Sequence, residues 1–299
     1  HPVTELITGI DLVEEMIKVA AGEKLSLKQK DVKLNGWAIE SRIYAEDPYR
    51  GFLPSTGRLS RYRPPIEQVV DGITVRNDTG VYEGGEISLF YDPMIAKLVT
   101  HGPDRLAATD AMADALDNFR IDGIRHNIDF CSAIMQHQRF RDGALTTAFI
   151  DEEYPEGFDG APMDSKRIEE LAVIGFTMTQ MAQMRATESS QGLDGHQYTP
   201  DVEQAVQIGD LVFTASKSAQ GVVLNGVDIE VESEWLPGDL FFFGAVNGKQ
   251  ISLTVDRHAE GYTLTGRGAA VKVCVRRLAA QQVMAYMPEK ADGSSDKEL

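Results

Sequence analysis

Hydrophobic and polar residues alternate over residues 37–44, which read WAIESRIY. A period of two is typical of a β-strand whose two faces meet different surroundings. Because strand side chains alternate between faces, the pattern predicts that Glu40 and Arg42 lie on the same face. A carboxylate and a cation placed in this way indicate either an anion site or a structural ion pair, and spacing alone favours the ion pair.

The rest of the first half of the chain mixes helix-like and strand-like segments. Apolar residues spaced three and four apart predict helices, and short apolar runs bounded by Gly, Asp and Pro predict strands. We expect helices over 8–21, 103–119, 127–136 and 146–151, and strands over 69–76, 86–90 and 94–101. The helix over 8–21 would start at Thr8 or Asp11 and end at Gly22. This mixture predicts an α+β domain with an antiparallel sheet.

A change of composition separates the two halves of the chain. Residues 151–164 are acidic and rich in Pro and Gly, which is typical of a linker. A helix of about twenty residues is expected from 165, and because it is apolar nearly all round, it should be buried. Residues 189–201 are polar and predict a loop. Short strands are then expected over 211–216, 221–224, 228–235, 240–246, 250–256, 262–265 and 271–278. Seven or eight antiparallel strands and one apolar helix predict a small barrel that encloses the helix.

Composition excludes several classes of protein. The chain has 299 residues, enough for about two domains, and a net charge of −17, which argues against binding nucleic acid or an anionic membrane. The basic cluster of Arg58, Arg61 and Arg63 is interpreted as a solvated loop face. No apolar run reaches the length of a membrane span. Only Cys131 and Cys274 are present, which fits a reducing compartment.

Several motifs resemble the biotin carboxylase family. They are RIYAEDP at 42–48, FLPSTG at 52–57, YDPMIAKL at 91–98, and HPVTE at 1–5. Long matches in the family's order are far more specific than one short pattern. Three further stretches resemble the α subunits of propionyl-CoA carboxylases: MADALDN at 112–118, HNI at 126–128 and YPEGF at 154–158. Since the chain opens on His1 inside a motif, we expect it to be part of a longer protein.

The resemblance implies a domain organisation. Residues 1–152 would be the C-terminal part of a biotin carboxylase domain and residues 153–164 a linker. Residues 165–290 would form a BT domain, an antiparallel β-barrel around a long helix that docks a partner subunit. Residues 291–299 would be a flexible tail toward a biotin carrier domain.

The resemblance also implies a site. Arg42 matches the family's arginine that holds the ureido oxygen of biotin, and Asp92 matches an aspartate that pairs with it. A guanidinium suits that role because it keeps its charge and offers several donors. Biotin, ATP and Mg²⁺ or Mn²⁺ would be the cofactors, with the ATP and metal ligands mostly in family segments that precede His1. No metal ligand is assigned in this chain, and no Ala-Met-Lys-Met biotin attachment motif occurs in it.

The implied function is that of an α subunit that carboxylates biotin with bicarbonate and serves the conversion of propionyl-CoA to methylmalonyl-CoA. A carboxyltransferase β subunit would be the partner, in a large α6β6 assembly. A bacterial cytosol or a mitochondrial matrix would be the location. Three alternatives stay open: a subunit for methylcrotonoyl-CoA or another acyl-CoA, a non-catalytic docking module, and a free-standing β-barrel protein with an unrelated ligand.

Overall fold

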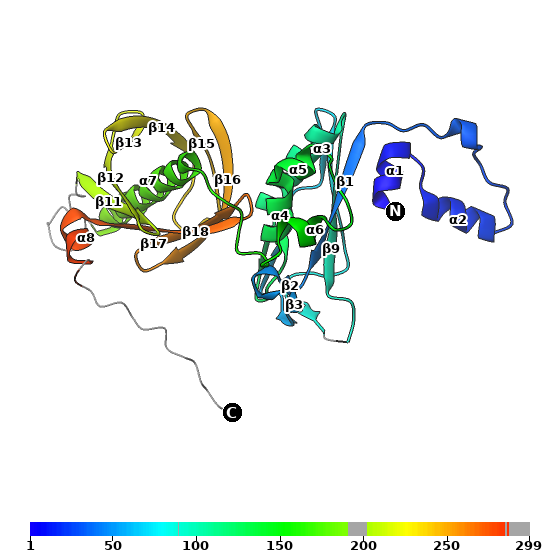
Figure 1. Cartoon of the computed structure of the whole chain (residues 1–299), viewed down its shortest axis with the longest axis horizontal. Coiled ribbons are helices and arrows are strands. Elements are labelled where there is room, and N and C mark those ends of the chain that lie inside the picture. The colour runs from blue at the N-terminus through cyan, green and yellow to red at the C-terminus, as the bar shows by residue number, and fades with distance from the viewer. Residues whose placement is uncertain (89, 191–201, 285, 287–299) are drawn as a thin grey trace, which may run out of the picture. The chain divides into compact units, whose positions relative to one another are not determined.

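The computed structural model describes residues 1–88, 90–190, 202–284 and 286 (Figure 1). The chain divides into two compact units. Unit 1 consists of His1–Met163, Ser252–Thr254 and Thr265–Ala270, and unit 2 of Asp164–Ile251, Val255–Leu264 and the chain from Val271 onward. No helix within the described ranges combines the length and the apolar character needed to cross a membrane.

Unit 1 is built on a four-stranded antiparallel sheet. Its strand order is β1-β9-β7-β6, with β1 at Trp37–Tyr44, β9 at Met94–Gly102, β7 at Ile73–Thr79 and β6 at Gln68–Val70. The strand expected over 37–44 is therefore confirmed. In the register, Arg42 lies opposite Lys97 and Lys97 lies opposite Asp78. These three residues therefore share one face of the sheet.

Helices cover both faces of this sheet. Helix α3 (Arg105–Asp117) packs on the face of Ile43 and Leu98, where Met112 and Leu116 complete a buried core. Helix α1 (Pro2–Thr8) contacts β1 and β9 on the opposite face. The other elements of unit 1 are α2 (Leu12–Ala20), α4 (Ile128–Gln136), α5 (Gln138–Arg141), α6 (Phe149–Glu153), the 3₁₀ turns Gln29–Asp31 and Pro48–Arg50, and the short strands β2 (Glu46–Asp47), β3 (Leu53–Pro54), β4 (Gly57–Arg58), β5 (Arg61–Arg63), β8 (Glu86–Ile87) and β10 (Arg120–Asp122).

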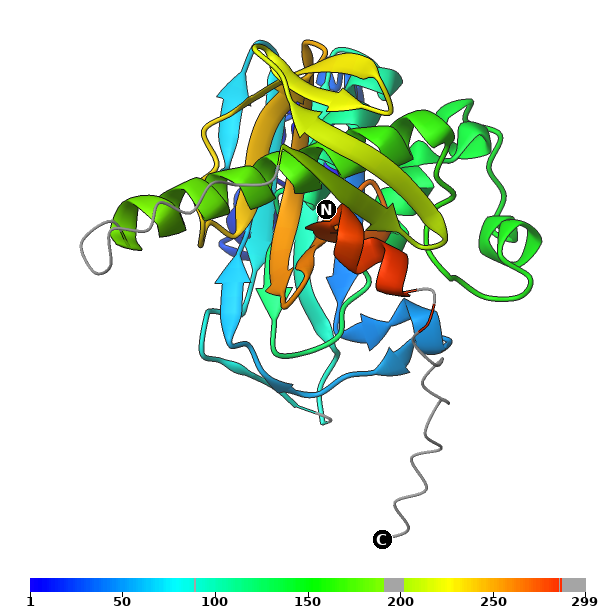
Figure 2. The same cartoon turned by 90° about the vertical axis from the view of Figure 1, so that its left-hand side faces the viewer.

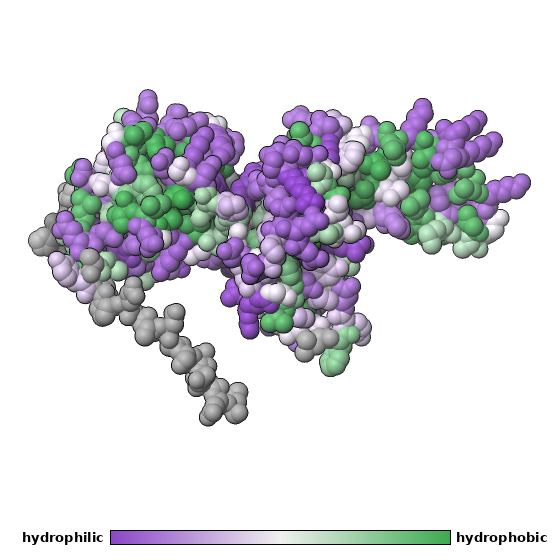
Figure 3. Space-filling view, viewed as in Figure 1, coloured by the Kyte–Doolittle hydropathy of each residue, from purple (hydrophilic) through white to green (hydrophobic). Residues whose placement is uncertain are grey.

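Of the two starts expected for the helix over 8–21, Asp11 is confirmed and Thr8 is wrong. Helix α1 ends at Gly9, whose φ of 69° only glycine adopts readily, and α2 (Leu12–Ala20) starts anew. The Asp11 carboxylate caps α2 by accepting from the backbone N–H groups of Val13 and Glu14. The apolar side of α2 is exposed, with Met16 70% accessible. In Figure 3, green apolar side chains accordingly lie among purple polar ones in the region of α2.

Two expected strands have other bounds than predicted. Asp71 and Gly72 have φ angles of 51° and 78°, so a tight turn divides the segment 69–76 between β6 and β7. The strand expected over 86–90 covers only Glu86–Ile87. The Ser88 hydroxyl accepts from the backbone N–H of Phe90, a local turn that competes with strand pairing.

Unit 2 is a closed antiparallel barrel of β11 to β18 around α7, as the sequence predicts. Helix α7 (Ser165–Ser190) starts after Asp164, whose carboxylate accepts from the backbone N–H of Arg167 at 2.7 Å. Figure 2 shows strands on both sides of this helix. Its inward residues Ile174, Phe176 and Met178 are at most 1% exposed. The strands are β11 (Glu203–Ile208), β12 (Leu211–Lys217), β13 (Gly221–Leu224), β14 (Val227–Ser233), β15 (Phe241–Val246), β16 (Lys249–His258), β17 (Gly261–Gly266) and β18 (Ala269–Arg277), followed by α8 (Leu278–Met284).

The strand that closes the barrel is absent from the expected set. Strand β11 pairs with both β12 and β18. Its sequence, EQAVQI, contains two glutamines, and Gln204 is only 2% exposed. Gln204 is buried because the Gln180 side chain on α7 donates to it at 2.9 Å. The loop expected over 189–201 falls almost entirely outside the described residues.

Candidate active-site face

The candidate site lies on the face of the unit 1 sheet that carries Arg42. Arg42 Nε and Glu40 Oε1 are 2.8 Å apart, which confirms that the two side chains share a face. The hydrogen bond to Glu40 is the main cause that raises the pKa of Arg42, and the Tyr44 hydroxyl adds to it. The Arg42 side chain is 56% exposed, so it presents a fixed positive charge to the surroundings of this face.

A second arginine joins the first motif of the chain to the same face. Arg76 on β7 bonds Asp78 Oδ1 through Nε at 2.7 Å and Glu5 Oε1 through Nη1 at 3.1 Å. These contacts raise the pKa of Arg76 against the opposing effect of burial. Since Glu5 belongs to α1, the HPVTE segment lies directly against the charged face. Sequence reasoning missed Arg76, Asp78 and Lys97, although alternation within 73–79 and the pairing of strands could have indicated them.

The expected ion pair between Arg42 and Asp92 is not formed. Glu40 is the carboxylate that pairs with Arg42. Asp92 is exposed, and its Oδ1 accepts from the backbone N–H of Met94 at 2.9 Å. Asp92 affects another carboxylate, that of Glu46. Burial is the main cause that raises the pKa of Glu46, and the negative charge of Asp92 raises it further. The alternating pattern of β1 places Glu40 two residues from Arg42, whereas Asp92 lies on the loop before β9.

The end of β1 is held by a residue from a distant segment. The backbone N–H of Tyr44 donates to Asn127 Oδ1 at 2.9 Å, and the backbone N–H of Asn127 donates to the Tyr44 carbonyl at 3.2 Å. Just beyond, the Asp47 carboxylate accepts from the backbone N–H of Tyr49 and begins a 3₁₀ turn. These contacts fix the backbone that carries Arg42.

The basic cluster near β5 has its own partners. Arg61 pairs with Asp122 at 2.9 Å and Arg63 with Glu83 at 2.8 Å. Arg58 Nε donates to the Gly84 carbonyl at 3.1 Å. These guanidinium groups are therefore engaged by the protein itself.

The chemistry of this face suits an acceptor with partial negative charge. Arg42 uses Nε for Glu40, and a guanidinium carries five N–H donors, so its terminal amino groups can serve another acceptor. A ureido oxygen, as in biotin, is such an acceptor. Within the part of the chain that the structure describes, no group of three or more His, Cys, Asp or Glu residues could hold a metal ion.

Comparison with protein families matches three consecutive segments. Residues 40–152 match the biotin carboxylase C-terminal domain, and residues 171–290 match the propionyl-coenzyme A carboxylase BT domain. Residues 1–28 match the ATP-binding domain of the carbamoyl-phosphate synthase L chain. The propionyl-CoA carboxylase α chain of Ruegeria pomeroyi is 47% identical over 100% of this chain and 47% of its own length. The chain belongs to the propionyl-CoA carboxylase α-chain family.

Other similar proteins cover this chain and their own length to different extents. The mitochondrial propionyl-CoA carboxylase α chain of Homo sapiens is 39% identical over 97% of this chain and 41% of its own length. The chain therefore spans less than half the length of these propionyl-CoA carboxylase α chains. A crystal structure of a complete multifunctional pyruvate carboxylase from Rhizobium etli is 38% identical over 56% of this chain and 16% of that one, with a TM-score of 0.49.

Proposed function

We propose that this chain is the part of a biotin-dependent propionyl-CoA carboxylase α subunit that helps to carboxylate biotin and docks the β subunit. One observation carries the proposal: identity to a propionyl-CoA carboxylase α chain, 47%, runs through the whole chain and so through both units. In the complete enzyme, ATP and bicarbonate would carboxylate biotin, and the carboxyl group would pass to propionyl-CoA to give methylmalonyl-CoA.

The proposal divides the work between segments. Residues 1–152 would contribute to the biotin carboxylase site and residues 153–164 would be the linker. Residues 165–290 would dock the β subunit, and residues 291–299 would lead toward the biotin carrier domain. The matches over 40–152 and 171–290 support this division. ATP and Mg²⁺ or Mn²⁺ are the further cofactors proposed for the complete subunit.

Arg42 has the central role in the proposed mechanism. Biotin supplies a ureido nitrogen that carries the carboxyl group. Arg42 would donate hydrogen bonds to the ureido oxygen, where negative charge develops when the weakly acidic N–H is lost. Glu40 would hold the guanidinium in place through its bond to Nε. Asp92 remains in the proposal as a carboxylate of the site, and the orienting contact is assigned to Glu40.

The proposed partners follow from the family. A carboxyltransferase β subunit, a biotin carrier domain and an α6β6 assembly are expected for the complete protein. The bacterial cytosol is the expected location, or the mitochondrial matrix in a eukaryote. Relatives named as propionyl-CoA carboxylase α chains occur in a bacterium and as mitochondrial proteins, which supports both locations.

The test replaces Arg42 in the complete α subunit and measures incorporation of labelled bicarbonate into biotin. Arg42→Ala should lower the rate by about a hundredfold or more, the scale seen when one donor to a developing oxyanion is removed. Arg42→Lys should be intermediate, since it keeps the charge and loses the forked donors. Arg63→Ala is a matched control, because Arg63 is also 56% exposed and also pairs with one carboxylate. A normal rate in Arg42→Ala would exclude the role of Arg42.

A second assay separates docking from chemistry. The Arg42→Ala subunit should still co-purify with the β subunit, because Arg42 lies in unit 1. Reconstituted α and β subunits should then be compared on propionyl-CoA and 3-methylcrotonoyl-CoA. A preference for 3-methylcrotonoyl-CoA would overturn the proposed substrate while leaving the biotin carboxylation step intact.

A further inference from the structure

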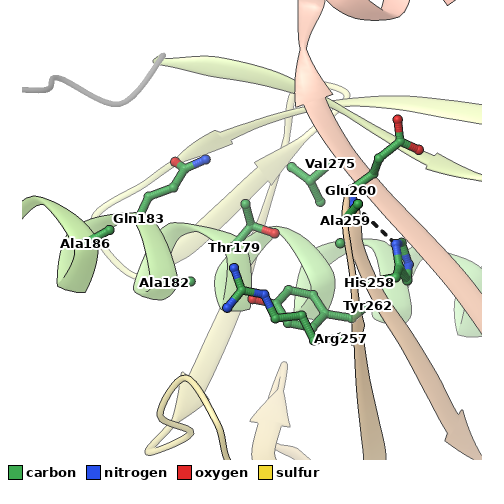
Figure 4. Close-up of a pocket in the computed structure, with 11 residues that line it drawn as sticks. Thr179, Ala182, Gln183, Ala186, Arg257, His258, Ala259, Glu260, Tyr262 and Val275 are labelled. Atoms are coloured by element: carbon green, nitrogen blue, oxygen red, sulfur yellow. Dashed lines mark hydrogen bonds between the residues drawn. The ribbon is translucent and has the colours of Figure 1, made fainter.

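The mouth of the barrel in unit 2 contains a cavity of about 270 Å³. One wall is the C-terminal half of α7, with Thr179 and Gln183, and the other is formed by β16, β17 and β18, with Arg257 and Val275 (Figure 4). All residues that line the cavity belong to unit 2, and none of them has a part in the mechanism proposed above. Openings at the ends of small barrels are common places for ligands.

Arg257 is an inward-facing cation at this mouth. On β16, Leu253 and Val255 are buried in the barrel, and Arg257 continues the same alternation two residues further on. Figure 4 shows its side chain extending from the strand toward α7. Among the described residues, no hydrogen bond or ion pair engages its guanidinium.

The carboxylate in the cavity wall is already occupied. Glu260 accepts two hydrogen bonds from Arg276, at 3.2 Å from Nε and 2.5 Å from Nη2. This pairing is the main reason that the pKa of Glu260 is lowered. Because Glu260 is paired with Arg276, it does not offset the charge of Arg257 at the mouth of the cavity.

Two polar side chains of α7 face the same space. The Gln183 side-chain oxygen is buried and accepts no hydrogen bond from any described residue. Rotation of this amide by 180° would present its NH₂ group instead. Thr179 Oγ1 donates to the Gly175 carbonyl at 2.8 Å, which leaves its own lone pairs available. A buried polar atom without a hydrogen-bond partner is unfavourable, so a hydrogen bond from a ligand to the Gln183 side chain would favour binding.

We propose that this cavity binds a small oxyanion, the carboxylate or phosphate group of a small molecule. Arg257 would supply the charge and a forked pair of donors, and the Gln183 amide would supply a further hydrogen bond. The remainder of the ligand would pack on apolar atoms of Val275 and Ala182. A volume of about 270 Å³ accommodates the anionic group and a small apolar remainder.

The test uses the full chain labelled with ¹³C at alanine methyl groups. Ala182 and Ala259 line the cavity and report occupancy directly. Succinate and inorganic phosphate are titrated at constant ionic strength, with neutral succinamide as the control of equal shape. At least one anion should shift both methyl signals saturably, with a Kd of about 1 mM or tighter. Succinamide should bind at least tenfold more weakly. The anion that binds identifies the oxyanion as carboxylate or phosphate.

Two variants assign the charge. Arg257→Gln should weaken binding at least tenfold, and since Arg257 is exposed and makes no ion pair with a described residue, the fold should persist. Lys217→Gln removes an exposed positive charge from β12, which does not line the cavity, and should leave the Kd unchanged. The proposal is overturned if neither anion shifts these signals up to about 20 mM. Equal affinity in Arg257→Gln, or equal binding of succinamide, would also overturn it.

Discussion

The side-chain amide of Asn127 donates a hydrogen bond to the backbone carbonyl of Arg42, with 3.1 Å between Nδ2 and the oxygen. Strand β1 is the outer strand of its sheet, so its backbone groups on that side have no neighbouring strand. Asn127 is 7% exposed and occupies the position that a neighbouring strand would take at Arg42 and Tyr44. The amide thus closes the edge of the sheet at the residue proposed to act on biotin.

Asn127→Ala should destabilise unit 1 and displace Arg42. It leaves a carbonyl and an N–H of β1 without their partner in a partly buried place, which costs up to about 1–3 kcal/mol of unfolding free energy. Denaturant unfolding of the full chain measures this loss. In the complete subunit, biotin carboxylation should also fall, by about tenfold, because a shift of β1 moves the guanidinium.

The control for this prediction is Asn35→Ala, at an exposed asparagine of the same unit. It should leave both the unfolding free energy and the rate near wild type. Equal stability of Asn127→Ala and wild type would show that water replaces the amide without cost. Lost stability with a normal rate would show that Asn127 has no part in positioning Arg42.

Arg76→Gln should loosen α1 from the sheet. Arg76 joins Glu5 of α1 to Asp78 of β7, and its side chain is 32% exposed, so the pair is partly screened by solvent. Such partly exposed pairs contribute about 0.2–1 kcal/mol. Amide hydrogen exchange of residues 2–8 should accelerate up to about fivefold, while exchange in α3 stays unchanged. Uniform acceleration in both helices would mean that the whole unit is destabilised.

The sequence pattern predicted those elements whose burial can be read from their own residues. The alternation of β1 depends on two faces that differ, and it correctly placed Glu40 beside Arg42. The barrel around an apolar helix could be predicted because α7 is apolar on nearly all sides. Strand β11 could not be predicted, because Gln204 resembles a surface residue until Gln180 on α7 is placed opposite it.

The motif singled out Arg42, and the contacts around it come from the fold. Arg42 followed from the resemblance, but its partner Glu40 replaced the expected Asp92 because an ion pair depends on the path of the loop before β9. Asn127 is distant in sequence from Arg42, and only the folded chain brings its amide to the Arg42 carbonyl and places Arg76 on the same face of the sheet. The apolar side of α2 predicted a helix correctly and could not predict that Met16 would be exposed.

Gly175→Ala should destabilise unit 2, although Ala is more favourable than Gly in a helix by about 1 kcal/mol. A Cβ on Gly175 would lie 2.5 Å from Val273 Cγ1, well inside ordinary contact distance. Val273 is fully buried in β18, so it has little room to move. The net loss should be about 1–3 kcal/mol, measured as a lower melting temperature.

Val273→Ala tests the cause of that loss. The single variant Val273→Ala should itself be destabilised, because it leaves a cavity. The loss of unfolding free energy in the double variant Gly175→Ala/Val273→Ala should be smaller than the sum of the two single losses by at least about 0.5 kcal/mol. Additive losses would show that the two side chains do not clash. A more stable Gly175→Ala would show that the helix and β18 can separate without cost.

Cys131 should resist alkylation in the folded chain. Burial, with a smaller contribution from the charge of Asp129, raises the pKa of Cys131 to about 12. Only the thiolate reacts, and a higher pKa leaves less thiolate, so its fraction at pH 8 should be roughly a thousandfold below that of an ordinary thiol with a pKa of about 8.5. The chain has only one other cysteine, Cys274, so a Cys274→Ser variant isolates Cys131.

Iodoacetamide labelling of Cys131, followed by mass spectrometry, should be slow at pH 8 and should become fast in denaturant. Rapid labelling without denaturant would mean that α4 opens readily around Asp129, and the aromatic packing of Phe130 on Phe158 would then be less stable than the structure indicates.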